Sequence, residues 1–440
     1  MAIAADVPKD NFRLSQLIYD TRYRSYTIQF FVLLLFVTFL GWLLDNTIAN
    51  LAAKDKDINF GFLWARAGYD IDQQLIPYTN DSTHFRALLI GLLNTLVVAF
   101  FACIGATILG VIAGVLRLSR NWLVARLMTV YVEVFRNVPL LLWIILCFIV
   151  FSEVPKEPKD FKVTQAMVDT WTGPEADRVY PAASKILFDT VAVTNRGTNI
   201  PAPLLYRPLG SVTIGGIPIN FSTLAVIFVF GGSLWINRRI RASAKVVQEA
   251  TGVRPVTWWK SIAVIVLPTA ALLVALGLHW EIPAFAASET GVSKGFNFQG
   301  GINVAHSFTA LLIALTLYSA TYIAEGVRAG ILAISRGQTE AAYALGLRPN
   351  RTMSLIVLPQ ALRVIIPPLI SQYLNITKNT TLGMAISYLD LKGTLGGITL
   401  NQTGRELECM LLMMLIYLML SLMISSVMNV YNNAMKLRER

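Results

Sequence analysis

The residue types that carry out covalent catalysis are scattered along this 440-residue sequence rather than grouped. No segment matches G-x4-G-K-[ST], the phosphate-binding loop of many ATP-hydrolysing proteins. The histidines and cysteines have neither the spacing of metal ligands nor that of a disulfide framework. We therefore expect no metal site, no bound cofactor, no catalytic centre and no ATP hydrolysis by this chain. The scattered residues are His84, His279 and His306, with Cys103, Cys147 and Cys409.

The residues that stand out by type and spacing lie between positions 337 and 359. The run EAA at 340–342 favours a helix. Gly346 suits the left-handed residue that ends a helix, and Pro349 suits the first turn of the next one. The small side chains at 341, 342 and 344 allow another protein surface to approach closely. We expect a helix–glycine–helix unit that docks a partner.

A second group of polar residues follows the pair Pro367-Pro368 in an otherwise apolar stretch. We expect this pair to interrupt the helix. A broken helix at membrane depth exposes backbone groups, which are tolerated where they line a cavity or lie inside protein. The simpler alternative is a polar helix end that faces outer water. Charges inside apolar helices are also candidates, and Glu133–Arg136 and Glu325–Arg328 have the spacing of helical ion pairs. The polar group is Asn375, Lys378, Asn379, Thr380 and Thr381.

The helices that must position these groups are membrane spans. Apolar residues make up 55% of the sequence and charged residues 14%, against about 25% charged in soluble domains. A bilayer core takes about 20 mostly apolar residues as helix. We expect eight spans, at about 28–44, 87–116, 130–151, 221–236, 262–278, 304–323, 358–376 and 407–430.

The formal net charge of +11 is explained by topology rather than by nucleic-acid binding. Basic residues concentrate in alternate segments between the spans, and such segments face the cytoplasm. Both termini are therefore expected inside. The basic residues are Lys9, Arg13, Arg22, Arg24, Arg117, Arg120, Arg126, Arg238, Arg239, Arg241, Lys245, Arg254, Lys260, Arg328, Arg336, Arg348, Arg351, Lys436, Arg438 and Arg440.

The opposite side carries three larger segments. Residues 45–85 are rich in aspartate, and 280–303 are rich in glycine. Residues 152–220 hold many prolines, and the alternating run at 211–218 predicts short strands and turns. We expect residues 45–85 and 152–220 to form an outer cap.

The motifs together resemble one family. The pattern EAA-x3-G-x9-I-x-L-P at 340–359 fits the coupling-loop signature of ABC-importer permeases at every fixed position. Residues 131–141 resemble the FR-x-x-PLL element of polar amino-acid permeases, and 93–96, 322–330 and 375–382 are similar to further family blocks. Thr381 stands where many relatives have Ser, and Val138 where Thr is usual. The sequence is identified as a member of the histidine/glutamate-type permease family. Its extra segments resemble the larger subfamily for general L-amino acids or glutamate, glutamine, aspartate and asparagine.

The resemblance implies an all-α polytopic membrane protein, with five core helices, three added helices and a small irregular or β-containing outer insertion. It implies five parts. Residues 1–85 form the tail, first span and outer loop, and 86–151 the first half of the core. Residues 152–220 form the periplasmic insertion, 221–304 an added helix pair with its outer loop, and 305–440 the second core half with the coupling loop at 335–358.

The resemblance also implies the partners of the chain in the bacterial inner membrane. Two ATP-binding subunits would bind ATP and Mg²⁺, a homologous permease would form a heterodimer with this chain, and a periplasmic amino-acid-binding protein would dock outside. Membrane lipid surrounds the chain, and no nucleic acid is involved. The residues that the resemblance assigns to ATPase coupling are Glu340, Ala341, Ala342, Gly346, Arg348 and Pro359.

A polar amino acid needs donors for its carboxylate and acceptors for its ammonium group. Lys378 and the hydroxyls offer donors, and Asn375 and Asn379 offer both kinds of group. With Glu325, the 375–381 group is our candidate substrate path. An ion-coupled secondary transporter is the alternative function, which would need an acidic ion site in mid-span. A membrane-bound enzyme would need a catalytic constellation that the sequence lacks.

Overall fold

A computed structural model describes residues 18, 21–53, 58–169, 185–214, 217–253, 255–287 and 292–435 of the chain. The N-terminal tail, part of the 152–220 insertion, Arg254 and the basic residues at 436–440 lie outside the described residues. The chain divides after Phe60 into two compact units. In the first unit, α2 (Thr21–Ala52) is strongly apolar and has none of its most apolar residues buried, as a span that faces lipid would.

Seven helices of the described residues are long and apolar enough to cross a membrane, and the number reaches eight if one bent pair counts as a span. This agrees with the expected fold class, an all-helical membrane protein with small sheets. The spans of the second unit are α3 (His84–Leu116), α7 (Phe221–Thr251), α8 (Trp258–Ala275), α9 (His306–Leu332), Pro349–Ile386, which includes α12 (Leu358–Asn379), and α14 (Glu406–Met435).

The third expected span, 130–151, is not one helix. It is divided between α4 (Trp122–Asn137) and α5 (Leu140–Glu153), which are bent by 104° at the break. The cause lies at Val138-Pro139. A proline disfavours helical backbone in the residue before it, and Val138 is extended, with φ −99° and ψ 134°. The third expected span is therefore present only as a bent pair of helices.

The expectation that Pro367-Pro368 interrupts the seventh span is wrong, because α12 continues through both prolines. Membrane helices tolerate proline where neighbouring groups compensate for the lost hydrogen bonds. The preceding residues Ile365 and Ile366 are buried in the core. The regular helix ends later, where a 3₁₀ segment (Thr380–Ile386) begins, and Ser387 after it is in the left-handed region. A π-helical segment (Lys392–Thr399) and α13 (Leu400–Thr403) then follow.

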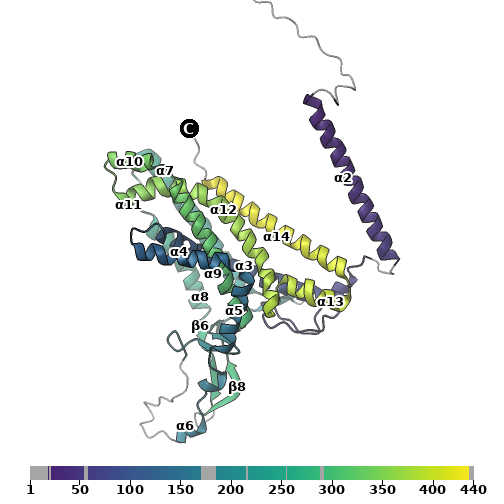
Figure 1. Ribbon diagram of the computed structural model, residues 1–440. Coiled ribbons are helices and arrows are strands. Elements are labelled where there is room, and N and C mark those ends of the chain that lie inside the picture. Colours follow the sequence, from purple (N-terminus) through teal and green to yellow (C-terminus); the bar gives the residue numbers. More distant parts are fainter. Residues whose placement is uncertain are drawn as a thin grey trace, which may run out of the picture. The chain divides into compact units, whose positions relative to one another are not determined.

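The core of the second unit forms where α3 and α9 pack together in parallel (Figure 1). Small residues on α3 recur every fourth position, a pattern that brings membrane helices close together. A Cβ atom added to Gly110 would lie 2.6 Å from the Ile323 Cβ, and one added to Gly114 would lie 2.6 Å from the Ala324 carbonyl oxygen. Helices α5 and α12 pack against the same core. The small residues of α3 are Ala102, Ala106, Gly110 and Gly114.

The outer segments pair with each other across the sequence. In a three-stranded sheet, β2 lies between β1 and β9. In a separate two-stranded sheet, β3 pairs with β6, and all these pairings are antiparallel. The predicted strands near 211–218 form the β4–β5 hairpin. The strands are β1 (Ala192–Thr194), β2 (Gly197–Ile200), β3 (Ala202–Leu205), β4 (Ser211–Ile214), β5 (Ile217–Asn220), β6 (Leu278–Glu281), β7 (Ala284–Ala287), β8 (Ser293–Gln299) and β9 (Ile302–Val304), and the short helices are η1 (Gly61–Trp64), η2 (Pro158–Phe161) and α6 (Gln165–Asp169).

This pairing decides which helix ends share a side of the membrane. Strand β5 leads into α7, α8 leads into β6, and β9 leads into α9. Each of these helices has one end at the strands and is long enough to cross the membrane. The turn between α7 and α8 therefore lies on the same side as the far end of α9, where the predicted docking unit begins.

Candidate functional site: the docking unit and the membrane path

The predicted helix–glycine–helix unit forms directly after α9. Helix α10 (Arg336–Ala344) is followed by Gly346 and by α11 (Pro349–Thr352), with Pro349 at its first position. Gly346 has φ +76°, a left-handed conformation that costs other residues about 1 kcal/mol or more. Figure 1 shows α10 and α11 together beside the beginning of α12.

Two backbone hydrogen bonds fix the turn at Gly346. The Leu347 N–H donates to the Ala342 carbonyl at 3.1 Å, and the Gly346 N–H donates to the Tyr343 carbonyl at 2.9 Å. This pair of bonds is the Schellman motif, which satisfies carbonyls that a helix end leaves free. An added Cβ at Gly346 would meet nothing within 4 Å. The requirement for glycine is therefore conformational and not steric.

The three EAA residues do not share one surface. Ala342 is only 1% exposed and faces its own chain, whereas Glu340 and Ala341 are exposed. The expectation that all the small residues face a partner is thus wrong for Ala342. Tyr343 and Leu345, which the sequence analysis did not single out, are 51% and 81% exposed. Exposed large apolar residues next to an acidic one are suited to contact another protein.

The two remaining residues that were predicted to take part in ATPase coupling have backbone roles. Arg348 is exposed and occupies the N-cap position of α11, where its carbonyl accepts hydrogen bonds from the Arg351 and Thr352 N–H groups. Pro359 lies in the first turn of α12, directly after a π-helical turn at Met353–Val357. Proline has no N–H to donate to the preceding turn, and local π-helical adjustments can satisfy the backbone groups that it leaves free in a membrane helix.

Glu325 forms ion pairs with two arginines near the end of α9 that leads to the docking unit. Its carboxylate accepts hydrogen bonds from Arg117 on α3 and, at 3.1 Å, from Arg328 one turn along α9. The predicted Glu325–Arg328 pair is present, and Arg117 was not predicted to join it. The Arg117 side chain is only 8% exposed. Both oxygens of Glu325 are thus engaged by cations.

The other predicted helical ion pair does not form. The ion pairs found among the described residues do not include Glu133 with Arg136. Instead, the Asn137 side-chain amide donates to Glu133 at 3.4 Å, and the Arg136 guanidinium lies over the Tyr322 ring, 5.7 Å from its centre. The bend after Asn137 ends α4 close to both side chains.

The five polar residues expected on a substrate path fall on different sides of α12 and its continuation. Asn375 and Lys378 are exposed and continue a face that begins with Pro368 and Ser371. Asn379 is half-buried. The Thr381 hydroxyl donates to the Lys378 carbonyl at 2.8 Å. Thr380 is fully buried and donates to Asp390 Oδ2 at 3.2 Å, so it does not face an open path.

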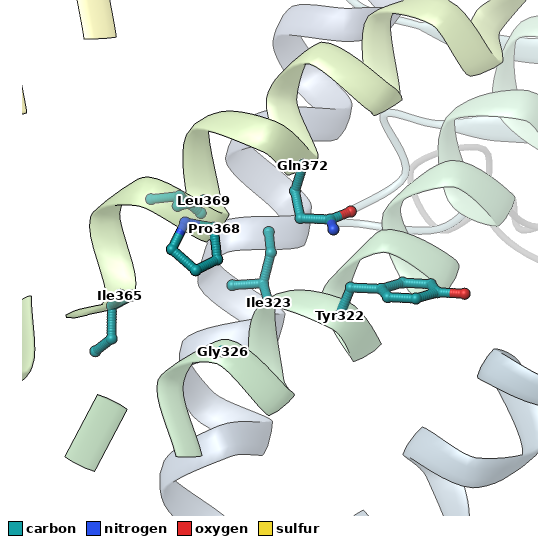
Figure 2. Close-up of a pocket in the computed structure, with 7 residues that line it drawn as sticks. All are labelled: Tyr322, Ile323, Gly326, Ile365, Pro368, Leu369 and Gln372. Atoms are coloured by element: carbon teal, nitrogen blue, oxygen red, sulfur yellow. The ribbon is translucent and has the colours of Figure 1, made fainter. Parts of the chain in front are cut away.

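The crossing of α9 and α12 leaves little room between these helices. Figure 2 shows Gly326 and Ile323 of α9 opposite Pro368 and Leu369 of α12, around a cavity of about 10 Å³. That volume has room for about one water molecule. An amino acid therefore cannot pass between the two helices in this conformation, and the exposed face of α12 is the better candidate.

Asp390 is a buried acid that the sequence analysis missed. It lies between the candidate spans that end at Ile386 and begin at Glu406. Burial raises the pKa of its carboxyl to about 6, against opposing hydrogen bonds from the Gly393 N–H and the Thr380 and Tyr417 hydroxyls. The signal available in the sequence was a lone acid followed by a glycine-rich run.

The segment around Asp390 is joined to the beginning of α3. Asn94 donates to the Leu389 carbonyl at 2.9 Å, and the Tyr388 hydroxyl donates to the Asn94 carbonyl at 3.1 Å. The Leu391 N–H donates to the Thr95 hydroxyl at 3.0 Å. A Cβ at Gly91 would lie 2.8 Å from the Asp390 carbonyl oxygen. The family block at 93–96 thus serves to anchor the chain that follows α12.

The described residues thus form a bundle of apolar helices long enough to cross a membrane, with the predicted docking unit after α9. Residues 261–437 match the family described as binding-protein-dependent transport system inner membrane component. The chain belongs to this family, the permease components of ABC transport systems. It is therefore a transport subunit, and the ATPase activity of such systems resides in separate partners.

Relatives match the chain over almost its whole length. It is 63% identical to the glutamate/glutamine/aspartate/asparagine transport system permease protein BztB of Rhodobacter capsulatus, over 100% of both chains. It is 40% identical to the general L-amino acid transport system permease protein AapQ of Rhizobium johnstonii, over 96% of this chain and 94% of that one. A crystal structure of an amino acid ABC transporter with histidines matches 80% of this chain and 95% of that chain, with 16% identity and a TM-score of 0.41.

Proposed function

We propose that this chain is one of two homologous permease subunits in an ATP-driven importer of polar L-amino acids in the bacterial inner membrane. Two ATP-binding subunits carry ATP and Mg²⁺, a periplasmic binding protein delivers the substrate, and both termini of this chain are cytoplasmic. The names of the two relatives support the substrate class. The excess of basic residues beside the docking unit supports the orientation.

The docking unit transmits movement of the ATPase subunits to the membrane helices. Its exposed residues Glu340, Tyr343 and Leu345 contact an ATPase subunit, and the Gly346 turn holds α10 at a fixed angle to α11. Helical structure continues from Pro349 through α12. A movement of the ATPase is therefore transmitted along α12 to the face that carries Asn375 and Lys378.

The paired outer strands support a role for the outer segments as a seat for the binding protein. Parts of 152–220 and 278–304 form one joined structure through β2–β9 and β3–β6. Strand β9 continues into α9 after one residue. We propose that docking of the binding protein on this cap shifts α9 and so affects the ion pair between α9 and α3.

Uptake of radiolabelled glutamate by cells that lack this chain, with and without its restoration, tests the function. ATP depletion with the proton gradient maintained should stop the restored uptake, and an uncoupler with ATP maintained should not stop it directly. Competition by unlabelled amino acids then separates an acidic/amide-specific importer from a general one. Uptake that persists without ATP contradicts the proposal and favours an ion-coupled transporter.

A further inference from the structure

A polar cavity lies at the end of the α7–α8 hairpin and has no part in the proposed transport mechanism. It has a volume of about 500 Å³. Its polar and aromatic lining comes from both sides of the turn, and the two helices pack against each other along the hairpin. These lining residues are Arg241, Lys245 and Gln248 from α7, with Thr257, Trp258 and Ser261 from the beginning of α8.

The lining of this cavity has the chemistry of an anion site. Arg241 and Lys245 bring two cations, and among the described residues Glu249 pairs with Lys245 at 3.7 Å in an exposed ion pair. The 18-residue helix α8 begins at the cavity, and Thr257 makes no side-chain capping bond to it. The first amides of a helix attract anions, phosphate in particular.

Ser261 provides a separate indication of an absent ligand. It is only 5% exposed, it lines the cavity, and its hydroxyl has no hydrogen-bond partner among the residues that the structure describes. A buried polar group without a partner costs about 1–3 kcal/mol. An anion in the cavity would accept a hydrogen bond from this hydroxyl.

The surroundings of the cavity place it at the level of lipid headgroups. Trp235, Trp258 and Trp259 are all more than half exposed, and tryptophan is enriched at the membrane–water interface. Two cations lie over tryptophan rings, Arg239 at 5.0 Å from Trp235 and Lys260 at 5.5 Å from Trp259. The turn shares a membrane side with the docking unit, as the strand connections require.

We propose that this cavity binds the phosphate of an anionic phospholipid headgroup. A lipid fits better than free phosphate because Ile262 and Val266 follow Ser261 along α8 and are more than half exposed. They offer an apolar surface to the acyl chains. Basic pockets between membrane helices on the cytoplasmic side are known to hold such headgroups. This assignment gives the added helix pair a ligand that the transport mechanism does not require.

The test measures lipid binding to the intact transporter complex. Delipidated complex is titrated with phosphatidylglycerol, phosphatidylcholine or inorganic phosphate, and the thermal unfolding midpoint is recorded. Phosphatidylglycerol should raise the midpoint, and the other two should not at matched phosphate concentration. The double variant R241Q/K245Q should bind phosphatidylglycerol at least tenfold more weakly. The variant R120Q/R126Q, which removes two exposed charges from a different segment on this side, should not.

The Ser261→Ala variant tests the cavity more finely, because a hydroxyl without a partner can be removed with little effect on folding. It should weaken phosphatidylglycerol binding severalfold and should not lower the midpoint without lipid, because it removes a buried hydroxyl that has no partner. Equal stabilisation by inorganic phosphate would show a free-phosphate site and overturn the lipid assignment. Unchanged phosphatidylglycerol binding by R241Q/K245Q would also overturn the lipid assignment. This holds whether or not the variant complex keeps its ATPase subunit.

Discussion

Arg117 at the end of α3 donates to the carboxylate of Glu325 on α9, which joins residues 208 positions apart at the end of the core that leads to the docking unit. The two helices pack closely above this pair, because glycines of α3 face α9. The ion pair therefore closes an interface that is otherwise held by small apolar residues. It also links the two segments that were predicted to be the halves of the permease core.

Replacement of Glu325 by Gln should destabilise the protein more than loss of its second arginine. Arg117 is nearly buried, and a buried charged group left without its partner costs about 1–3 kcal/mol or more. Arg328 is 37% exposed, and an exposed ion pair contributes about 0–1 kcal/mol. Thermal unfolding in detergent should rank wild type, R328Q and E325Q in falling order. Equal midpoints for the two variants would contradict this account of the pair.

The close packing of α3 and α9 predicts a large effect for a single methyl group. Gly110→Ala places a Cβ 2.6 Å from Ile323 and 2.9 Å from the Ala320 carbonyl oxygen, and such overpacking costs about 1–3 kcal/mol. Gly232→Ala on α7 is the control, because its new Cβ meets nothing within 4 Å. Alanine also favours helix over glycine by up to about 1 kcal/mol. The unfolding midpoint should fall for G110A and not for G232A.

Asp390 predicts a pH-dependent stability of unusual sign. Burial raises the pKa of its carboxyl from an ordinary value near 3.8 to about 6. The folded state therefore holds this proton more tightly than the unfolded state, and stability contributed by this group falls as the pH rises from about 4 to about 6. D390N removes that loss, since its amide stays neutral.

The comparison of unfolding midpoints for wild type and D390N between pH 5 and 7.5 checks this prediction. As the pH rises, the free energy of unfolding of D390N should increase relative to that of the wild type, by on the order of 2 kcal/mol at most. The Thr380 and Tyr417 hydroxyls can reverse their hydrogen bonds to meet the new amide. A difference that is constant over this range would contradict the raised pKa.

The exposed face of α12 predicts a selective defect in transport. Lys378→Gln removes a cation suited to a substrate carboxylate, and Asn375→Ala removes an amide on the same face. Each should raise the apparent KM for uptake severalfold and leave the co-purification of partner subunits unchanged. Gln372→Ala, which lies at the narrow cavity between α9 and α12 and not on this face, serves as the control and should leave uptake unchanged. Unchanged uptake in K378Q and N375A would remove this face from the substrate path.

The docking unit was predictable because local chemistry determines it. Glycine at 346 and proline at 349 each have one favoured backbone role, and the structure gives them those roles. The bend at Val138-Pro139 was equally local, but an apolar run of span length concealed it. The double proline in α12 led to the opposite error, a predicted break where the helix is continuous. Neighbouring helices can stabilise a helix around proline, and the sequence does not show such contacts.

The rest of the site depends on contacts between distant segments. Nothing near Glu325 in the sequence indicates Arg117, and nothing near Asp390 indicates that α3 and Tyr417 enclose it. The exposure of Tyr343 and Leu345 and the burial of Ala342 depend on how α10 lies against α11 and the following turn. Such facts follow from tertiary structure and not from motif or composition.

The most direct test of the docking unit is the recovery of ATPase activity with the tagged chain after gentle extraction from its native membrane. Gly346→Val forces a β-branched residue into a left-handed turn, so it should abolish the recovered activity. Gly346→Asn, which tolerates that conformation, should retain much of it. Gly337→Ala, in the same unit but without a positive φ and with nothing within 4 Å of its new Cβ, should retain all of it. Equal ATPase recovery with G346V and wild type would contradict the account, and so would the absence of ATPase from wild type.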